Sequence, residues 1–417
     1  MIRVKAYLPS YRQIEVKSDR RARIGDLKRS ICNQLEIEPE LTKLLYRGHP
    51  LPEESHIAEL GNREAPLIVD YLWARHLIVW GSQGQKKIRS ATVLLAGAGA
   101  IGNEVGKNLA MLGVGRLLIV DRDSVELSNL SRMIFFGPKD LSENKAEVLA
   151  RNIHQKYPYT ETAGFRGDLE AMPLKFYLDS DVVVCGLDNV VSRIYLTQTC
   201  RKYSIPMIDG GIMGLNVRVQ TYIPPEAPCP VCVFPPNQYS QIVGLRNPCD
   251  APPEQGAAPS FPTSISLVSS VLSQETVKLI LGWQQYRRSA TWPDYSGEPL
   301  KSILFVDLQN NRYTSVGMKR NEKCYVCGSE GIAKEVVPRF ELAFSRIRGS
   351  KKRFEETIRQ TLKAEHGTLV VFSETSLGEA TLETASRRMR RIQKGDYLRV
   401  LSEIHAGEFT ESTIKLT

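Results

Sequence analysis

Residues 93–102 read VLLAGAGAIG, and this stretch decides the fold. Its first four residues are apolar and predict a buried strand, and the glycines that follow, Gly97, Gly99 and Gly102, have the spacing GxGxxG. Glycine adopts positive φ without strain and lets the backbone approach a ligand closely. The pattern therefore predicts a tight turn between a strand and a helix, with room for a phosphate beside it.

The residues after this turn extend the interpretation. A helix expected over 104–112 would point its N-terminal N–H groups at the phosphate. A second strand expected over 116–120 delivers Asp121, nineteen residues after Gly102, where a carboxylate can accept hydrogen bonds from ribose hydroxyls. A glycine turn can also serve only to close a helix on a sheet, but the strand, turn, helix and acid together favour a nucleotide site.

Length and composition limit the class of protein. A chain of 417 residues is too long for one compact core, and its 42% hydrophobic and 24% charged residues are typical of a soluble globular protein. No apolar run approaches the ~18 residues that a membrane helix needs, so we expect no membrane partner. Residues 1–16 alternate and carry charge, which predicts a strand rather than a signal peptide, and a cytoplasmic location. The net charge of +9 is spread along the chain, so nucleic acid is not the expected partner.

We expect three domains, over residues 1–72, 73–333 and 334–417. The first has the pattern of two strands, a helix and two strands that is typical of a β-grasp domain. Its segments LLYRGHPLPEESHIAELG at 44–61 and LIVDYL at 67–72 resemble ubiquitin. No Gly-Gly follows Leu72, so this domain lacks the tail through which a ubiquitin is conjugated. We interpret it as a docking or regulatory module.

The second domain alternates strands with helices over most of its length. Such alternation implies a mostly parallel, doubly wound α/β sheet. The third domain is rich in lysine and arginine, with strands expected at 366–374 and 395–404 around a basic helix at 381–393. The fold class is therefore α/β, with a β-grasp domain before the central sheet and a small α+β domain after it.

Three charged residues that follow Asp121 in the sequence help to distinguish two classes of nucleotide-binding enzyme. Arg132 and Lys145 follow Asp121, and a hydride-transfer enzyme has no need for cations in this place. An enzyme that splits ATP between its α and β phosphates does, because cations neutralise charge on the α-phosphorus and on the leaving pyrophosphate. Asp188, in CGLDN, follows an apolar strand at the edge where open α/β sheets bind ligands. One carboxylate together with phosphate oxygens is a common way to hold Mg²⁺.

Four segments read together resemble one family. They are GAGAIG at 97–102, DRDSVELSNLSR at 121–132, NKAEV at 144–148 and GLDN at 186–189. This combination resembles the ubiquitin-activating enzyme superfamily, which includes the adenylating proteins ThiF, MoeB and HesA. The resemblance implies a Rossmann-like adenylation domain that uses ATP and Mg²⁺, in a homodimer.

The resemblance implies a role for each matching residue of the second domain. The glycine turn would bind ATP, with Asp121 on its ribose and Asp188 on the Mg²⁺ ion. The phosphates would be contacted by Asn129, Arg132 and Lys145. We expect the two cations of this set to be catalytic.

Two further positions are interpreted through the same resemblance. Arg75, in WARHL, matches the arginine that reaches into the neighbouring subunit's ATP site and takes part in catalysis there. Family members often have a glutamine directly after the arginine that Arg132 matches, and Met133 stands in that place here. A polar contact made by that glutamine is therefore not expected in this chain.

Four of the eight cysteines form two CxxC pairs, CPVC and CYVC. The pairs stand beside proline and glycine and look exposed. They are Cys229 with Cys232 and Cys324 with Cys327. Two thiolates from each pair complete a closed tetrahedral shell for a structural zinc ion, whereas the alternative is a set of reduced core cysteines. The family resemblance agrees with zinc.

Cys249 stands apart, in GLRNPCDAPPEQG ahead of an expected helix. A thiol on a loop near an arginine can be exposed and have a lowered pKa. The resemblance places the family's nucleophilic cysteine in this region, although an incidental loop cysteine is the alternative. The remaining cysteines are expected in cores: Cys32, Cys185 and Cys200.

These observations predict an activating enzyme for a ubiquitin-like protein. The C-terminal glycine carboxylate of the partner would attack ATP to form an acyl-adenylate, and Cys249 would then form a thioester. The third domain resembles, in strand order and in GDYLRVLSEI at 395–404, the ubiquitin-fold domain that recruits a conjugating enzyme.

Two alternatives stay open. A ThiF-like or MoeB-like adenylyltransferase would hand the adenylate of a sulfur-carrier protein to a sulfur donor, although no rhodanese-like segment is evident. A non-catalytic scaffold that binds ubiquitin-like proteins is the other, and the complete set of charged site residues argues against it. A nicotinamide dehydrogenase is not supported, because nothing in the chain supplies an acid or base for hydride transfer.

Overall fold

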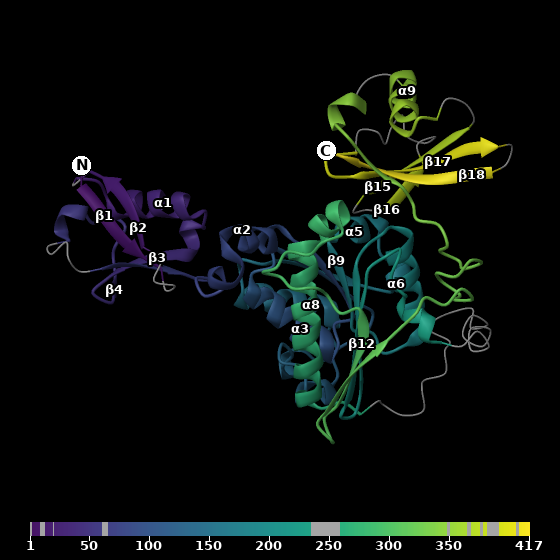
Figure 1. Ribbon diagram of the computed structural model, residues 1–417, viewed down its shortest axis with the longest axis horizontal. Coiled ribbons are helices and arrows are strands. Elements are labelled where there is room, and N and C mark those ends of the chain that lie inside the picture. The colour runs from purple at the N-terminus through teal and green to yellow at the C-terminus, as the bar shows by residue number, and fades with distance from the viewer. Residues whose placement is uncertain are drawn as a thin grey trace. The chain divides into compact units, whose positions relative to one another are not determined.

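The computed structural model contains two compact units, and each is described separately (Figure 1). One unit comprises Met1–Ser90, Met111–Val114 and Ile280–Glu298, and the other comprises Ala91–Ala110, Gly115–Leu279 and Pro299–Thr417. The structure describes residues 2–8, 13–19, 21–60, 66–234, 259–347, 351–364, 368–375, 378–381, 392–405 and 408–417. Cys249 lies outside these residues.

The first unit contains the predicted β-grasp fold. Its five strands lie in the order β2-β1-β5-β3-β4, with β1 and β5 parallel. The elements are β1 Ile2–Tyr7, β2 Gln13–Ser18, α1 Ile24–Leu35, β3 Thr42–Tyr46, β4 His49–Pro50 and β5 Leu67–Tyr71. The helix presents Leu27 and Ile31 to a core that also contains Leu44 and Val69, all of which are buried. The predicted pattern of two strands, a helix and two strands did not include the short strand β4.

The chain beyond β5 continues into packed structure rather than into a tail. Trp73 is buried, and its indole N–H donates to the carbonyl of Met111 at 2.9 Å. Arg89, near the end of α2 (Leu77–Ser90), lies 5.0 Å over the Trp73 ring and donates to Glu38 at 3.1 Å. Helix α2 is kinked at Gly81, where φ is 66°. These contacts agree with the prediction that the first domain has no conjugation tail.

The second unit contains an eight-stranded sheet in the order β13-β12-β11-β10-β9-β6-β7-β8. The strands are β6 Thr92–Ala96, β7 Arg116–Asp121, β8 Glu161–Arg166, β9 Val182–Cys185, β10 Met207–Met213, β11 Asn216–Tyr222, β12 Ser302–Asp307 and β13 Arg312–Gly317. Strands β10, β9, β6, β7 and β8 are parallel, whereas β11 to β13 extend the sheet antiparallel. The connection from β10 to β11 turns at Gly214, where φ is +62°, and so short a link permits only an antiparallel pair. The predicted parallel pairing is confirmed for β10, β9, β6, β7 and β8.

Helices cover both faces of this sheet (Figure 1). They are α3 Ala100–Leu112, α4 Lys145–Lys156, α5 Leu174–Asp179, α6 Val190–Lys202 and α8 Pro262–Ser289. A Cβ on Gly210 of β10 would meet Leu272 of α8, while the preceding Asp209 bonds to Arg193 of α6. Successive strand residues point to opposite faces, so α8 and α6 lie on opposite sides of the sheet.

Among the described residues, α8 is the one helix whose length and composition also fit a membrane span. The sequence had shown no such run. Of its most apolar window, 61% is buried inside the structure, and the core helix of a globular protein passes the same test. Glu275 of α8 is buried and accepts hydrogen bonds from the Thr221 hydroxyl at 2.9 Å and the Leu300 N–H at 2.7 Å. These contacts are those of a core helix.

The C-terminal part forms a third sheet, in the order β14-β18-β17-β15-β16. Its elements are β14 Arg339–Leu342, α9 Lys351–Leu362, β15 Leu369–Thr375, β16 Gly378–Thr381, β17 Tyr397–His405 and β18 Glu408–Leu416. Both predicted strands are present as β15 and β17. The basic helix predicted at 381–393 falls mostly outside the described residues. Helix α9 was missed, although Phe354 and Ile358 lie four residues apart and are both buried.

Candidate active site and metal centre

The glycine turn joins β6 to α3, and two of its glycines are required by the turn itself. Gly97 has φ +100°, and a Cβ there would lie 3.0 Å from the carbonyl oxygen of Gly186. A Cβ on Gly102 would lie 2.1 Å from the carbonyl oxygen of Gly97, which no side chain tolerates. Helix α3 begins at Ala100 rather than at the predicted 104, so Gly102 belongs to its first turn.

Gly99 differs from these two glycines. A Cβ there would meet no atom within 4 Å, and its φ is not in the left-handed region. Neither the packing nor the backbone conformation therefore requires glycine at position 99. The missing side chain leaves space over the turn, beside the first N–H groups of α3. A phosphate group binds favourably in such a place. The residues present thus fit a nucleotide phosphate.

Asp121 ends β7 and connects it to the glycine turn. Its Oδ2 accepts the Ala98 N–H at 2.7 Å, and its Oδ1 accepts the Asp123 N–H at 2.8 Å. Burial raises the pKa of Asp121, while these backbone hydrogen bonds and the nearby Lys145 act in the opposite direction. A carboxylate has about four acceptor positions, so both oxygens can still accept hydrogen bonds from ribose hydroxyls.

Replacing Asp121 with asparagine should weaken ATP binding about tenfold, or ~1.4 kcal/mol. The amide retains one acceptor oxygen but turns an NH₂ group toward the second backbone N–H. We also expect a loss of ~1–3 kcal/mol in unfolding free energy. Calorimetric titration with ATP and thermal unfolding measure the two effects.

Asp181→Asn is the matched control. The Asp181 carboxylate also accepts a backbone N–H, from Thr92 at 2.9 Å, at the opposite end of β6. This variant should lose stability without losing ATP affinity. Equal ATP affinity for Asp121→Asn and the wild type would contradict the ribose role.

Lys145 lies next to Asp121 because of how α4 begins. Asn144 caps this helix by accepting the N–H groups of Ala146 and Glu147, and its own amide donates to the carbonyls of Asp121 at 2.9 Å and Asp123 at 3.1 Å. The Lys145 ammonium lies 3.1 Å from the Asp123 carboxylate. Asn144 was not predicted as a cap, although asparagine directly before a helix is a typical N-cap.

Asn129 and Arg132 belong to the 3₁₀ turn Leu127–Ser131 and its end. Asn129 is buried and accepts the Glu126 N–H at 3.0 Å, so it holds the turn together. The Arg132 guanidinium is half-buried and donates to the Ser128 carbonyl at 2.7 Å. Within the described part of the chain, no hydrogen bond or ion pair links either residue to the Asp121 carboxylate. Their phosphate contacts stay predictions.

Met133, at the position where family members often have glutamine, is buried. Arg75 belongs to the other unit, where it is exposed just before α2. Its predicted role toward a neighbouring subunit stays a prediction.

Asp188 lies in the loop between β9 and α6, beside the glycine turn. Strands β9 and β6 are neighbours, and the Gly186 N–H donates to the Ala96 carbonyl at 2.9 Å. Asp188 is exposed, and among the described residues its carboxylate has no hydrogen bond or ion pair. An unpaired carboxylate next to a phosphate-binding turn fits a Mg²⁺ ion, which takes one or two carboxylates together with phosphate oxygens.

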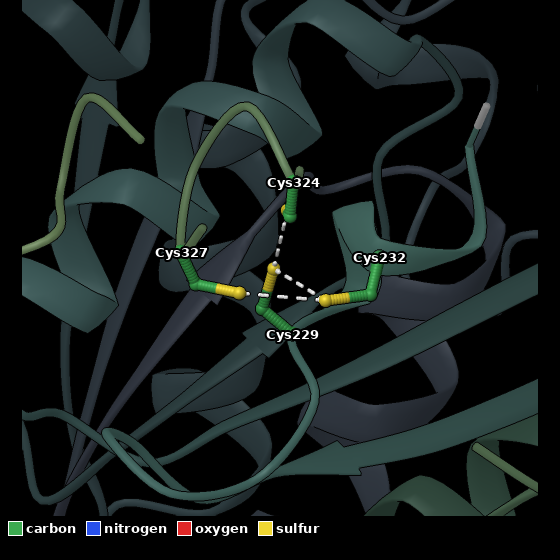
Figure 2. Close-up of side chains that lie close together, drawn as sticks. All are labelled: Cys229, Cys232, Cys324 and Cys327. Carbon is green, nitrogen blue, oxygen red and sulfur yellow. Dashed lines mark hydrogen bonds between the residues drawn. The ribbon is translucent and has the colours of Figure 1, made fainter. Parts of the chain in front are cut away.

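The two CxxC pairs come together (Figure 2). Their four sulfur atoms lie within 4.8 Å of one another, with separations of 3.8 Å from Cys229 to Cys232, 3.6 Å from Cys229 to Cys324 and 3.4 Å from Cys232 to Cys327. Four sulfurs placed 2.3 Å from a zinc ion in a tetrahedron would be about 3.8 Å apart. The thiols therefore fit zinc. They are buried, so the expectation of exposed pairs was wrong.

The other described cysteines are also buried, as predicted. Burial raises the pKa of Cys32 and Cys200, and it raises the pKa of Cys185 to about 12. The structure thus places seven of the eight cysteines inside the protein. Cys249 falls within residues 235–258, outside the described part of the chain.

Comparison with known proteins defines the class. Residues 73–326 match the ThiF family, and residues 2–69 match the Ubiquitin family. The chain belongs to the ThiF family, with a ubiquitin-like domain before it.

Its relatives come from several branches of this family. It is 29% identical over 279 residues to the SAMP-activating enzyme E1 of Haloferax volcanii, covering 62% of this chain and 89% of the relative. It is 27% identical over 270 residues to the sulfur carrier protein adenylyltransferase of Thermus thermophilus, with the same two coverages. With the NEDD8-activating enzyme E1 catalytic subunit of Saccharomyces cerevisiae it shares 38% over 149 residues, covering 34% of this chain and half of the relative.

Solved structures agree on the fold. A crystal structure of E. coli MccB with MccA-N7isoASN has a TM-score of 0.50 at 20% identity, covering 62% of this chain and 75% of that chain. The family and these relatives support an adenylyltransferase enzyme.

Proposed function

We propose that this protein is an ATP-dependent activating enzyme for a ubiquitin-like protein. One observation carries the proposal: the glycine turn, Asp121, Lys145 and the Asp188 loop gather at the carboxyl end of parallel strands. That edge is where open α/β sheets bind their ligands.

The reaction follows from the charges at this edge. A carboxylate oxygen of the partner's C-terminal glycine attacks the α-phosphorus of ATP, and the bond from that phosphorus to the bridging oxygen breaks. Pyrophosphate leaves, and an acyl-adenylate remains. Lys145 and Arg132 stabilise the charge that develops on the phosphoryl oxygens. Mg²⁺, held by Asp188, would supply further charge neutralisation.

The second step of the proposal uses Cys249. Its thiolate attacks the acyl carbon of the adenylate, a thioester forms and AMP leaves. The seven described cysteines are buried, and four of them belong to the metal cluster, so they are poor candidates. The thioester would then pass to a conjugating enzyme recruited by the C-terminal domain. Arg75 would act across a homodimer.

A second candidate function shares only the first step. The Thermus thermophilus relative is a sulfur carrier protein adenylyltransferase and covers as much of this chain as the Haloferax volcanii enzyme does. In this alternative, the adenylate of a sulfur-carrier protein passes to a sulfur donor and needs no thioester on Cys249.

Exchange of labelled pyrophosphate into ATP tests the shared step. Wild-type protein with Mg²⁺ and a ubiquitin-like or sulfur-carrier protein that ends in a free glycine should catalyse this exchange. Asp188→Ala should lower the rate by ~10²–10³-fold, because it removes the proposed metal ligand. Asp181→Asn, at the far end of the sheet, should keep the wild-type rate.

Two results would refute this assignment. Full exchange by Asp188→Ala would remove Asp188 from the metal role. A wild-type protein that binds ATP but exchanges pyrophosphate with none of the candidate partners would contradict adenylation itself.

A further inference from the structure

A buried charge cluster lies beside the candidate active site, outside the residues that the sequence indicated. Asp209 of β10 is fully buried, and its carboxylate accepts hydrogen bonds from Arg193 of α6 and from Arg218 of β11. The Arg218 contact measures 2.5 Å. The side chains of Arg193 and Arg218 are themselves 13% and 24% exposed.

Such a cluster is costly to bury, so a contribution to stability is a weak explanation for it. Moving charges out of water carries a penalty of several kcal/mol per ion, which only good geometry offsets. An arginine guanidinium does not lose its proton in proteins, so Arg193 stays charged and keeps all its donors.

Arg193 does more than pair with Asp209. Its Nη2 atom donates to the carbonyl of Leu187 and, at 2.9 Å, to the carbonyl of Gly210. One guanidinium thus connects the loop between β9 and α6 to strand β10 by hydrogen bonds. Leu187 directly precedes Asp188, so the hydrogen bond to the loop lies one residue from the proposed metal ligand.

The loop is held on the other side of Asp188 as well. The side chain of Asn189 accepts the Ser192 N–H at 2.8 Å and caps α6. The backbone around Asp188 is therefore fixed from both sides, whereas its carboxylate is unpaired among the described residues. A carboxylate with a fixed backbone and free oxygens is arranged to meet a cation.

We propose that Arg193 is a positioning residue, which Asp209 orients so that it holds the Leu187 carbonyl and directs Asp188 toward the Mg²⁺ of bound Mg·ATP. The inference rests on the proposed function and names a residue that supports the same site. Residues that orient a metal ligand typically change metal affinity by ~10–100-fold when replaced.

The cluster offers a matched pair of variants. Lysine at position 193 keeps the positive charge beside Asp209, but a single ammonium lacks the planar fork that reaches the carboxylate and both carbonyls. Arg218→Lys is the control, because Arg218 bonds the same carboxylate and, in the described structure, donates no hydrogen bond to the Asp188 loop.

Metal affinity can be measured without turnover by titrating Mn²⁺ in the presence of a non-hydrolysable ATP analogue. Electron paramagnetic resonance monitors the binding. Arg193→Lys should bind Mn²⁺ about tenfold more weakly, and Arg218→Lys should match the wild type. Hydrogen exchange of the nucleotide-free protein should be faster at residues 186–188 in Arg193→Lys alone. Saturating Mg²⁺ should restore the pyrophosphate exchange rate of that variant.

Two outcomes would overturn the positioning role. Wild-type Mn²⁺ affinity in Arg193→Lys would do so, and so would an equal loss in Arg218→Lys, since that result assigns the cluster to stability. A wild-type protein that binds no Mn²⁺ with the nucleotide would instead overturn the proposed function.

Discussion

Replacing Cys229 with serine is expected to remove the bound zinc and to destabilise the second unit strongly. The wild type should contain about one zinc ion per chain, because both CxxC pairs contribute to a single tetrahedral shell. Serine does not replace a thiolate ligand, so the remaining three sulfurs would hold the ion only weakly.

The effect on stability should be large because the site joins distant parts of the chain. Cys229 and Cys232 follow β11, while Cys324 and Cys327 follow β13, and all four belong to the same hydrophobic core. A structural zinc ion contributes roughly 10–16 kcal/mol to the folding of zinc-finger peptides. Loss of the ion would also leave buried thiols that hydrogen-bond one another, which raises the pKa of Cys229 and lowers the pKa of Cys327.

Elemental analysis after treatment with a mild chelator, together with thermal unfolding, measures both effects. Cys200→Ala is the matched control, because Cys200 is fully buried in the same core but outside the cluster. It should keep the zinc and lose only the ~1–3 kcal/mol of a small cavity. Stoichiometric zinc in Cys229→Ser, or none in the wild type, would contradict the assignment.

Local patterns predicted well the half of the central sheet that contains the glycine turn. An apolar run, the glycine spacing and the following acid each depend on neighbours in the sequence, and β6, the turn, α3 and β7 all have their expected order. The CxxC spacing likewise predicted that the thiols would act in pairs. It carries no information on burial, which depends on the surrounding core. The pairs were expected to be exposed because proline and glycine stand beside them.

What the sequence did not reveal depends on distant contacts. In the sequence, Asp209 is a single acidic residue in an otherwise apolar strand. Its two arginine partners become evident only when α6 and β11 pack around β10. Strand direction raised the same difficulty. The alternation of strands and helices predicts parallel pairing, whereas β10 and β11 pair antiparallel across the short turn at Gly214. The carbonyl partners of Asn144, on Asp121 and Asp123, lie 23 and 21 residues before it and are not evident from the sequence.

Replacing Cys249 with serine is expected to abolish the covalent adduct with the partner and to leave pyrophosphate exchange within about twofold of the wild type. Adenylation needs only the partner's carboxylate and the α-phosphorus of ATP, so no thiol takes part in it. Thioester formation needs a thiolate, and a serine hydroxyl is not ionised near neutral pH. Any ester formed by serine would resist thiols, whereas a thioester is cleaved by them.

Non-reducing gels with and without added thiol, run beside the exchange assay, separate the two steps. Cys32→Ser is the control, because burial raises the pKa of Cys32 in the β-grasp domain and this thiol should not react. An adduct that survives Cys249→Ser would refute the nucleophile assignment. The sulfur-carrier alternative would instead be established by two results together. The wild type would catalyse pyrophosphate exchange without forming an adduct, and added sulfur donor would convert the partner's C-terminus to a thiocarboxylate.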